Sequence, residues 1–139
     1  MATWVQGPAE LPSRHSALVA LPVIATLCTL GRDGPMLSAV WYEWADGGVS
    51  CSVPPDGVIE RNVRHNPWAA LLIAGTDRPY CGIEYRGEVT TDDDYLPVLT
   101  RLAVRYLGAL AGAEYLVGHP ANLHLRMQHG RFRLWDDDL

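Results

Sequence analysis

The 139-residue chain contains no lysine, because all eleven of its basic residues are arginines. Without a lysine there is no amine to form a Schiff base with a carbonyl substrate or to anchor pyridoxal phosphate. A phosphate-binding loop of the Walker A type, which needs a lysine, is excluded as well. Arginine side chains and backbone amides are the groups left to hold an anionic ligand.

Cysteines are few, and their spacing favours no metal site. Cys28, Cys51 and Cys81 are odd in number, widely separated and form no CxxC pair. No cluster of cysteine and histidine has the spacing of a zinc site, so we assign no metal. We interpret the three cysteines as reduced packing residues, as expected for a cytoplasmic protein.

Long apolar runs and a net positive charge are both absent. The longest apolar run spans residues 17–30, includes Pro22, and is shorter than the roughly 20 residues that a membrane-spanning helix needs. The net charge is −5 at pH 7, whereas binding to nucleic acid needs a basic face. We therefore expect neither a membrane nor a nucleic acid as partner.

The order of the predicted elements indicates one domain over residues 1–139, with a loose N-terminal arm at residues 1–8. A hydrophobic content of 48% is enough for a core of its own. Alternating patterns and turn residues predict strands at 25–30, 36–44, 49–53, 68–74, 81–91, 122–128 and 131–135. Helices are predicted at 13–21, 56–66 and 95–107, with Ser13 and Asp56 as N-caps and Gly108 as a C-cap. Because the strands follow one another as hairpins, we predict a mostly β fold, a barrel of six to seven mainly antiparallel strands with peripheral helices.

Three further sequence patterns predict local features of the sheet. Apolar residues alternate with Glu84, Arg86 and Glu88, and Gly87 interrupts the inward row, which predicts a bulge or a close approach of two backbones. Residues 36–44 are apolar on both faces, which predicts a central strand or the floor of a ligand site. Gly130 is predicted to turn the chain between the last two strands.

An ordered set of short segments resembles one known family. The first hairpin holds Ala25-Thr26-Leu27-Cys28-Thr29-Leu30, Arg32-Asp33-Gly34-Pro35 and Ser38-Ala39-Val40-Trp41-Tyr42. The next helix and strand hold Arg61-Asn62-Val63-Arg64-His65-Asn66-Pro67 and Ala69-Ala70-Leu71-Leu72-Ile73. Arg78-Pro79-Tyr80, Glu84-Tyr85-Arg86-Gly87 and Arg105-Tyr106-Leu107-Gly108 follow in order. Over residues 20–136 the chain resembles the pyridoxamine-phosphate-oxidase-like split β-barrel superfamily, an FMN-binding type of fold, and within it the flavin/deazaflavin oxidoreductases.

This resemblance implies a homodimer with two cofactor sites at the subunit interface. It implies the deazaflavin coenzyme F420, with FMN as the alternative, and hydride transfer to a small unsaturated organic substrate. Tyr80, at a loop–strand junction, is the candidate proton donor. Ile59 occupies the position where many relatives place a phosphate-binding lysine. The other matching cofactor-binding residues are Ser38, Ala39, Val40 and Trp41 along the ring, Ser52, Val53 and Pro54 beside the ribityl phosphate, and Arg61, Asn62 and Arg64 on the helix near that phosphate.

Two other functions fit the same residues. A non-catalytic dimeric module that binds a small hydrophobic molecule would explain Ile59 and the Asp33-Gly34-Pro35 turn, which is one residue shorter than is usual in the family. An FMN-dependent oxidase that reacts with oxygen is the third alternative. We interpret the remaining conspicuous side chains as structural: Trp44 and Trp68 as core or interface aromatics, and Arg101 and Arg105 as a solvated helix face.

Overall fold

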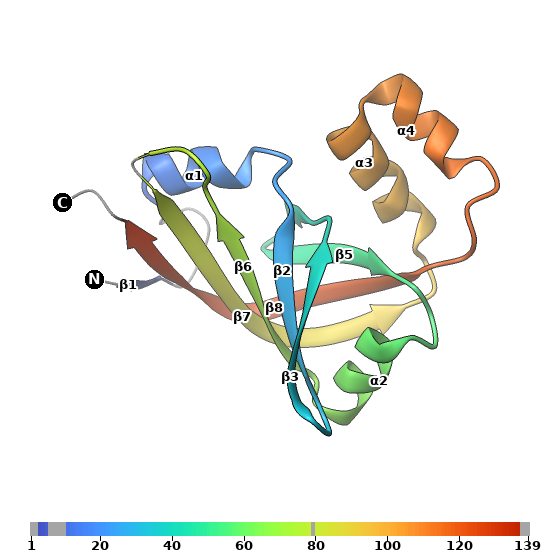
Figure 1. The fold of residues 1–139 in the computed structure, drawn as a ribbon, viewed down its shortest axis with the longest axis horizontal. Helices are drawn as coiled ribbons and strands as arrows, with labels where there is room; N and C mark the ends of the chain where they lie inside the picture. Colours follow the sequence, from blue (N-terminus) through green and yellow to red (C-terminus); the bar gives the residue numbers. More distant parts are fainter. Residues whose placement is uncertain (1–2, 6–10, 79, 137–139) are drawn as a thin grey trace.

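Eight strands and four helices make up the part of the chain that the computed structural model describes, residues 3–5, 11–78 and 80–136 (Figure 1). The strands are β1 (Thr3–Val5), β2 (Ala25–Gly31), β3 (Gly34–Val40), β4 (Glu43–Ala45), β5 (Gly48–Val53), β6 (Trp68–Ala74), β7 (Cys81–Asp92) and β8 (Leu123–Asp136). The helices are α1 (Ser13–Val19), α2 (Val58–His65), α3 (Leu96–Leu107) and α4 (Ala109–Leu116). The prediction of a mostly β protein is confirmed.

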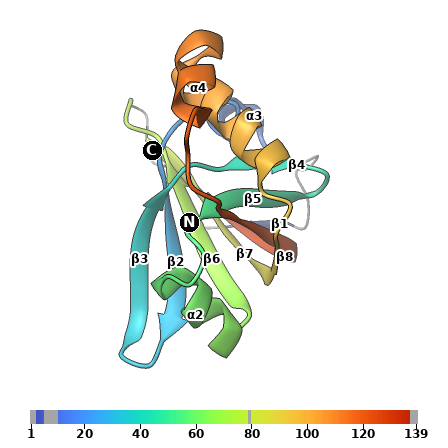
Figure 2. The ribbon, with the colours of Figure 1, turned by 90° about the vertical axis from the view of Figure 1, so that its right-hand side faces the viewer.

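The strands form one curved antiparallel sheet that stays open along a seam. Their order is β3-β2-β6-β7-β8-β5-β4, and β1 adds to β8. Because β3 and β4 are the two ends of this order, the sheet folds over into two halves without closing, which is the split form of a barrel. Figure 2 shows α2 at the lower end, between the halves, and α3 and α4 at the upper end.

The core lies between the two halves of the sheet. It is built from inward-facing residues that alternate along the strands, such as Leu27 and Ile83, both fully buried. An aromatic cluster fills one part of it, where the Trp44 ring lies 4.5 Å from that of Phe132 and 5.3 Å from that of Tyr85, between centroids. Trp44 is therefore a core aromatic, one of the two roles predicted for it.

β8 is one continuous strand of 14 residues, where the sequence predicted two strands separated by a turn. It pairs with β7 along most of its length, with β5 through its first half and with β1 through its second half. At Gly130 the chain continues without reversing, directly after His129, whose φ is 53°. The partner strand has a register shift between Arg86 and Glu88, so the bulge predicted at Gly87 is confirmed.

The structure also corrects the strand predicted at 36–44. β3 ends at Val40 and β4 begins at Glu43, because the backbone N–H of Tyr42 leaves the sheet and donates a hydrogen bond to the hydroxyl of Tyr106 (3.2 Å). β3 is an edge strand and not a central one. Its other predicted role, the floor of a ligand site, is consistent with the cavity described below.

Three further predictions on local structure were wrong. Residues 3–5 of the predicted loose arm form β1, and the rest of that arm lies outside the described residues. The N-caps of α1 and α2 are Pro12 and Gly57, so neither Ser13 nor Asp56 caps a helix through its side chain. α4 lies where a loop was expected, directly after Gly108, which does end α3 as predicted.

The outer side of β3, β2 and β6 is apolar and exposed. The pairing registers place Leu37 beside Cys28, and Cys28 beside Ala70, in one row across the three strands. Leu37 is 69% exposed and Trp68 is 51% exposed. We call this patch the outer sheet face and define it by Cys28, Leu30, Leu37, Ala39, Trp68, Ala70 and Leu72.

Burial of two cysteines confirms their packing role. Burial raises the pKa of Cys51 to about 12 and also raises that of Cys81, so both thiols stay protonated and unreactive near neutral pH. Cys28 is half-buried on the outer sheet face. Separately, none of the helices within the described residues has the length and apolar character needed to cross a bilayer.

Candidate functional site

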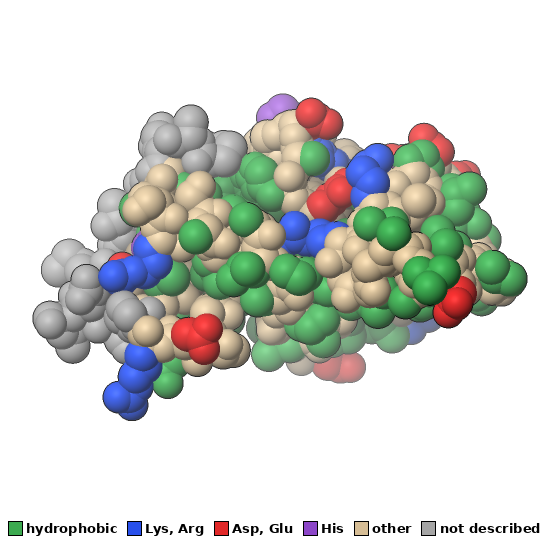
Figure 3. Space-filling model, turned by 90° about the horizontal axis from the view of Figure 1, so that it is seen from above, with side chains coloured by type: hydrophobic (Ala, Val, Ile, Leu, Met, Phe, Trp, Pro, Cys, Tyr) green, Lys and Arg blue, Asp and Glu red, His purple; other side chains and the backbone are tan. Residues whose placement is uncertain are grey.

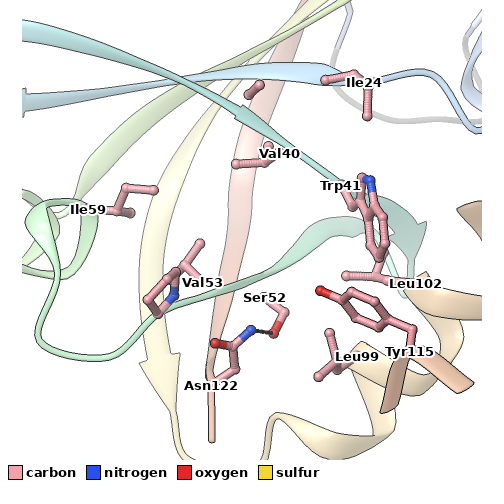
Figure 4. A pocket seen from close by; sticks show the side chains of 12 residues that line it. Ile24, Val40, Trp41, Ser52, Val53, Ile59, Leu99, Leu102, Tyr115 and Asn122 are labelled. Atoms are coloured by element: carbon pink, nitrogen blue, oxygen red, sulfur yellow. Dashed lines mark hydrogen bonds between the residues drawn. The ribbon is translucent and has the colours of Figure 1, made fainter. Parts of the chain in front are cut away.

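A cavity of about 270 Å³ opens between the ends of β3 and β5, the start of α2 and the α3–α4 pair (Figure 4). Ligand pockets usually measure about 300–1,000 Å³, so one protomer encloses a small ligand or only part of a larger one. The walls are mostly apolar and carry three polar side chains. The lining residues are Ile24, Ala39, Val40, Trp41, Ser52, Val53, Pro54, Ile59, Leu99, Leu102, Tyr115 and Asn122.

Trp41 forms a rigid aromatic wall of this cavity. Its ring stacks on Tyr106 with centroids 5.0 Å apart and planes 7° apart, and it lies 5.3 Å from the Tyr115 ring. The Tyr106 hydroxyl donates to the backbone oxygen of Val23 (2.7 Å) and accepts from the backbone N–H of Tyr42 (3.2 Å). Because Tyr106 is fixed on both sides, the wall is formed before any ligand binds.

Three polar side chains of the cavity stand among its aliphatic ones (Figure 4). The side-chain amide of Asn122 donates to the Ser52 hydroxyl (2.8 Å), which leaves the amide oxygen of Asn122 free to accept. The Tyr115 hydroxyl points from α4 into the space between Ser52 and Trp41 (Figure 4). The lining set contains no charged side chain.

A carboxylate already occupies the start of α2. Glu60 is buried, and its Oε1 accepts a hydrogen bond from the backbone N–H of Asp56 (2.6 Å). Its Oε2 accepts one from Arg64 (2.8 Å). The Glu60 carboxylate therefore neutralises both the positive end of the α2 dipole and the charge of Arg64. A phosphate bound by Arg64 would compete with Glu60.

A second cavity of about 430 Å³ lies beside the same helix, and its lining is more basic. It is lined by Gly31, Arg32, Asp33, Val58, Arg61, Asn62 and His65. Arg61 is exposed, and among the residues that the structure describes its side chain donates only to the backbone oxygen of Asp56 (3.3 Å). The amide of Asn62 is instead buried and donates to the Thr29 hydroxyl (3.0 Å), which ties α2 to β2.

The structure divides the predicted cofactor-binding residues between these two cavities. Ala39, Val40, Trp41, Ser52, Val53, Pro54 and Ile59 line the first, whereas Arg61 and Asn62 line the second. Ser38 pairs with Leu27 and faces the core, and Arg64 lines neither cavity. Tyr80 lies in the loop between β6 and β7, with the Arg78 guanidinium 5.7 Å from its ring centre, and does not line the first cavity.

Sequence reasoning missed Tyr115 and Asn122. Tyr115 follows Gly108, where a loop was expected, and Asn122 was expected on the exposed side of the strand at 122–128, so neither was assigned to a site. A signal was present: residues 109–116 include three alanines, and alanine is the strongest helix former. With that helix predicted, Tyr115 would have come under consideration as a side chain held by a rigid element.

Arg101 and Arg105 join α3 to neighbouring elements, so they do more than form a solvated helix face. The Arg101 guanidinium makes three hydrogen bonds to the Glu43 carboxylate (2.7–3.1 Å). Arg105 donates to the backbone oxygens of Val19 (3.0 Å), the last residue of α1, and of Leu21 (2.8 Å), just beyond it. These contacts hold α3, and with it Leu99 and Leu102, against the cavity.

A serine, a histidine and an aspartate also meet on β5, β8 and β7, but their geometry is structural. His124 contacts the Asp92 carboxylate through Nδ1 (3.1 Å) and the Ser50 hydroxyl through Nε2 (2.9 Å). Ser50 is 3% exposed and also accepts from Arg126 (3.2 Å). A substrate cannot reach this hydroxyl, so the three side chains tie adjacent strands together.

Solved structures of similar shape decide the fold. A conserved hypothetical protein of Mycobacterium tuberculosis superposes with a TM-score of 0.72 at 24% identity, covering 88% of this chain and 82% of its own. An F420 reductase superposes with a TM-score of 0.70 at 24% identity, covering 85% of this chain and 94% of its own. A Listeria innocua protein assigned as a pyridoxamine 5'-phosphate oxidase superposes with a TM-score of 0.61 at 15% identity, covering 81% of this chain and 87% of its own.

This chain has a split-barrel fold, the architecture that it shares with these three solved structures. Identities of this size establish the architecture of the split barrel. Its chemistry has to be argued from the residues of the site. No protein-family model matches the sequence, and no protein of curated function matches it. The function is therefore argued from the two cavities beside α2.

Proposed function

We propose that this split barrel is a flavin- or deazaflavin-dependent oxidoreductase that reduces a small unsaturated organic substrate. The observation that carries the proposal is the first cavity, where seven residues of the predicted cofactor set meet around a preformed aromatic wall. When bound, the coenzyme supplies the hydride. The chain needs to bind and orient two flat molecules and to exclude water, which agrees with its mostly apolar lining.

The residues of the first cavity fit a flat heteroaromatic ring. Val40 and Val53 offer aliphatic contact, Trp41 offers an aromatic edge or face, and Asn122 offers one free acceptor. The choice of F420 over FMN is supported by the sequence resemblance and by the F420 reductase of the same fold. Titration of the protein with each coenzyme, followed by tryptophan fluorescence, tests this choice. We expect micromolar or tighter binding of F420, and binding of FMN alone would select the FMN branch.

We assign the coenzyme's phosphate to the basic side of α2, where Arg61 is exposed and forms no ion pair within the described residues. The Arg61→Ala variant is expected to bind F420 about 10- to 100-fold more weakly, because a charge-assisted contact to phosphate is lost. The same fluorescence titration measures the effect. Arg78→Ala removes an arginine from the far end of the molecule and serves as the matched control. Equal affinity in both variants would place the phosphate elsewhere.

We propose that the active form is a homodimer that uses the outer sheet face. This patch and the first cavity share Ala39, so a second copy seated on β3 would lie at the cavity mouth. Such a copy would enlarge a cavity that is small for a coenzyme and a substrate together. A charged row lies beside the patch, in which Glu84 pairs with Arg86 (3.0 Å) and with Arg133 (2.6 Å). Because it carries both signs of charge, this row is compatible with the self-complementary surface that a two-fold interface requires.

A second candidate function is a non-catalytic module that binds a small hydrophobic molecule in the same cavity. It is favoured by the lack of any charged side chain in the lining and by the Glu60 carboxylate at the start of α2. Failure of both coenzymes to bind, together with binding of an apolar dye, would support this candidate over the oxidoreductase.

Ile59 provides a gain-of-function test between the two candidates. Ile59→Lys places an ammonium group in the first cavity, whereas Arg61 lines the second. It is expected to strengthen FMN binding by about 10- to 100-fold only if the phosphate lies in the first cavity. Ile59→Met keeps the apolar volume and is the control. If Ile59→Lys binds FMN no more tightly than Ile59→Met, residue 59 does not contact the phosphate. The absence of a lysine at this position would then no longer support the non-catalytic module.

A further inference from the structure

A hydrogen-bonded pair leads from the first cavity to the turn after α4. The Tyr115 hydroxyl oxygen lies 3.1 Å from Nε2 of His119, and Nδ1 of His119 lies 2.7 Å from the backbone oxygen of Pro120. A backbone oxygen only accepts, so Nδ1 carries a proton. In the neutral imidazole, Nε2 is then the acceptor for the Tyr115 O–H.

Protonation of His119 reverses this hydrogen bond. Both ring nitrogens of an imidazolium are donors, so Nε2 would donate to the Tyr115 oxygen while Nδ1 still donates to Pro120. The Tyr115 proton is then free to turn toward the cavity, into which the hydroxyl points (Figure 4). The pair therefore has one arrangement that keeps the tyrosine proton and another that offers it to a bound molecule.

The surroundings of the pair suit this role. The ring centroids of Tyr115 and His119 lie 4.9 Å apart. Trp41 packs against Tyr115, with 5.3 Å between the centroids of their rings. Tyr106 is stacked behind Trp41, and its hydroxyl donates to the backbone oxygen of Val23. The Arg105 guanidinium lies 5.7 Å from the centre of the Tyr106 ring. Within the described residues, no carboxylate or guanidinium bonds to either member of the pair.

We propose that Tyr115 is the proton donor of this enzyme and that His119 is the residue that recharges it. The proposal rests on the proposed function. Reduction of a conjugated ketone adds a hydride at the β-carbon, supplied by the reduced coenzyme, and moves the electron pair of the C=C bond toward the carbonyl. Tyr115 gives its proton to the resulting enolate, takes the Nε2 proton of the imidazolium, and His119 regains a proton from water. The product gains one hydride and one proton, which balances the reduction.

The test compares two hydride acceptors that differ in their need for a proton. Cyclohex-2-en-1-one takes a hydride and a proton, whereas an N-methylacridinium salt takes a hydride only. Tyr115→Phe is expected to lower kcat for the enone by about 100-fold or more, and to lower acridinium reduction far less. Tyr95→Phe, which removes a hydroxyl outside the cavity, is the control and should change neither rate.

The role of His119 is tested by the pH dependence of the enone rate, which would not change if His119 only packed against Tyr115. In the coenzyme-free protein, NMR should show Nδ1 protonated in the neutral imidazole and give the titration midpoint of His119. The enone rate should fall with rising pH around that same midpoint, and His119→Gln should abolish this pH dependence.

Each outcome of these measurements decides one question. An enone rate that does not depend on Tyr115, or equal losses with both acceptors, would overturn the assignment and leave the proposed function standing. A protein that binds neither coenzyme would overturn both.

Discussion

Replacing Gly130 with alanine is expected to destabilise the fold by about 3–5 kcal/mol, at the upper end of single substitutions. A Cβ at this position would overlap the backbone oxygen of Arg86 and lie 2.7 Å from the Tyr85 ring. A backbone oxygen held in the β7–β8 pairing cannot move aside as a flexible side chain could. The strand pair would have to separate at the point where it bends.

Thermal unfolding measures this effect, and the expected loss is about 10–20 °C in Tm for a chain of this size. Gly75→Ala is the matched control, because a Cβ there meets the backbone oxygen of Cys81 at an ordinary 3.4 Å. That variant should remain within about 1 kcal/mol of the original protein. If both variants unfold at the same temperature, the close packing of β7 on β8 does not limit stability.

Replacing Leu37 with arginine is expected to convert the proposed dimer into monomers. Leu37 lies on the edge strand β3, on the side of the outer sheet face that adjoins the cavity, and is 69% exposed. A guanidinium buried there without a partner would weaken association by about 3 kcal/mol or more, which is about 100-fold. Because the cavity adjoins this face, coenzyme affinity should fall with dimerisation. Sedimentation of the protein over a range of concentrations gives the first effect and fluorescence titration gives the second.

The molecule offers a matched control on a different apolar surface. Hydrophobic side chains also cover the α3–α4 end, at the right in the view from above (Figure 3), where Leu110 is 76% exposed. Leu110→Arg makes the same chemical change at this second surface and should leave the dimer intact. A monomer with Leu110→Arg and a dimer with Leu37→Arg would move the interface to the helices.

The parts of the fold that follow a local period were predictable from the sequence. The alternation of residues 81–91 gave the inward row of β7, and a glycine in an inward position gave its bulge. Two errors came from treating single residues as stop signals. Gly130 reads as a turn, yet its lack of a side chain serves the close approach of Arg86. Gly108 does end a helix, but a second helix follows at once.

The candidate site was predictable only in part. Residues on β3 and β5 were found because short segments resemble a known family, and seven of them line one cavity. Tyr115 was missed, since its position depends on how α4 packs on α3 near Trp41. The role of Arg105 also could not be read from its spacing, because its partners, the backbone oxygens of Val19 and Leu21, are more than 80 residues away.

The length of β8 has a consequence for how this protein is made. β8 joins the two halves of the sheet, and the strands that it pairs with, β1, β5 and β7, all precede it in the chain. During synthesis these strands leave the ribosome with their pairing edges unfilled, which favours contact with chaperones or with other nascent chains. Folding therefore completes only after residue 136 has emerged, and mutations in β8 should lower yield in the cell more than they lower the stability of the folded protein.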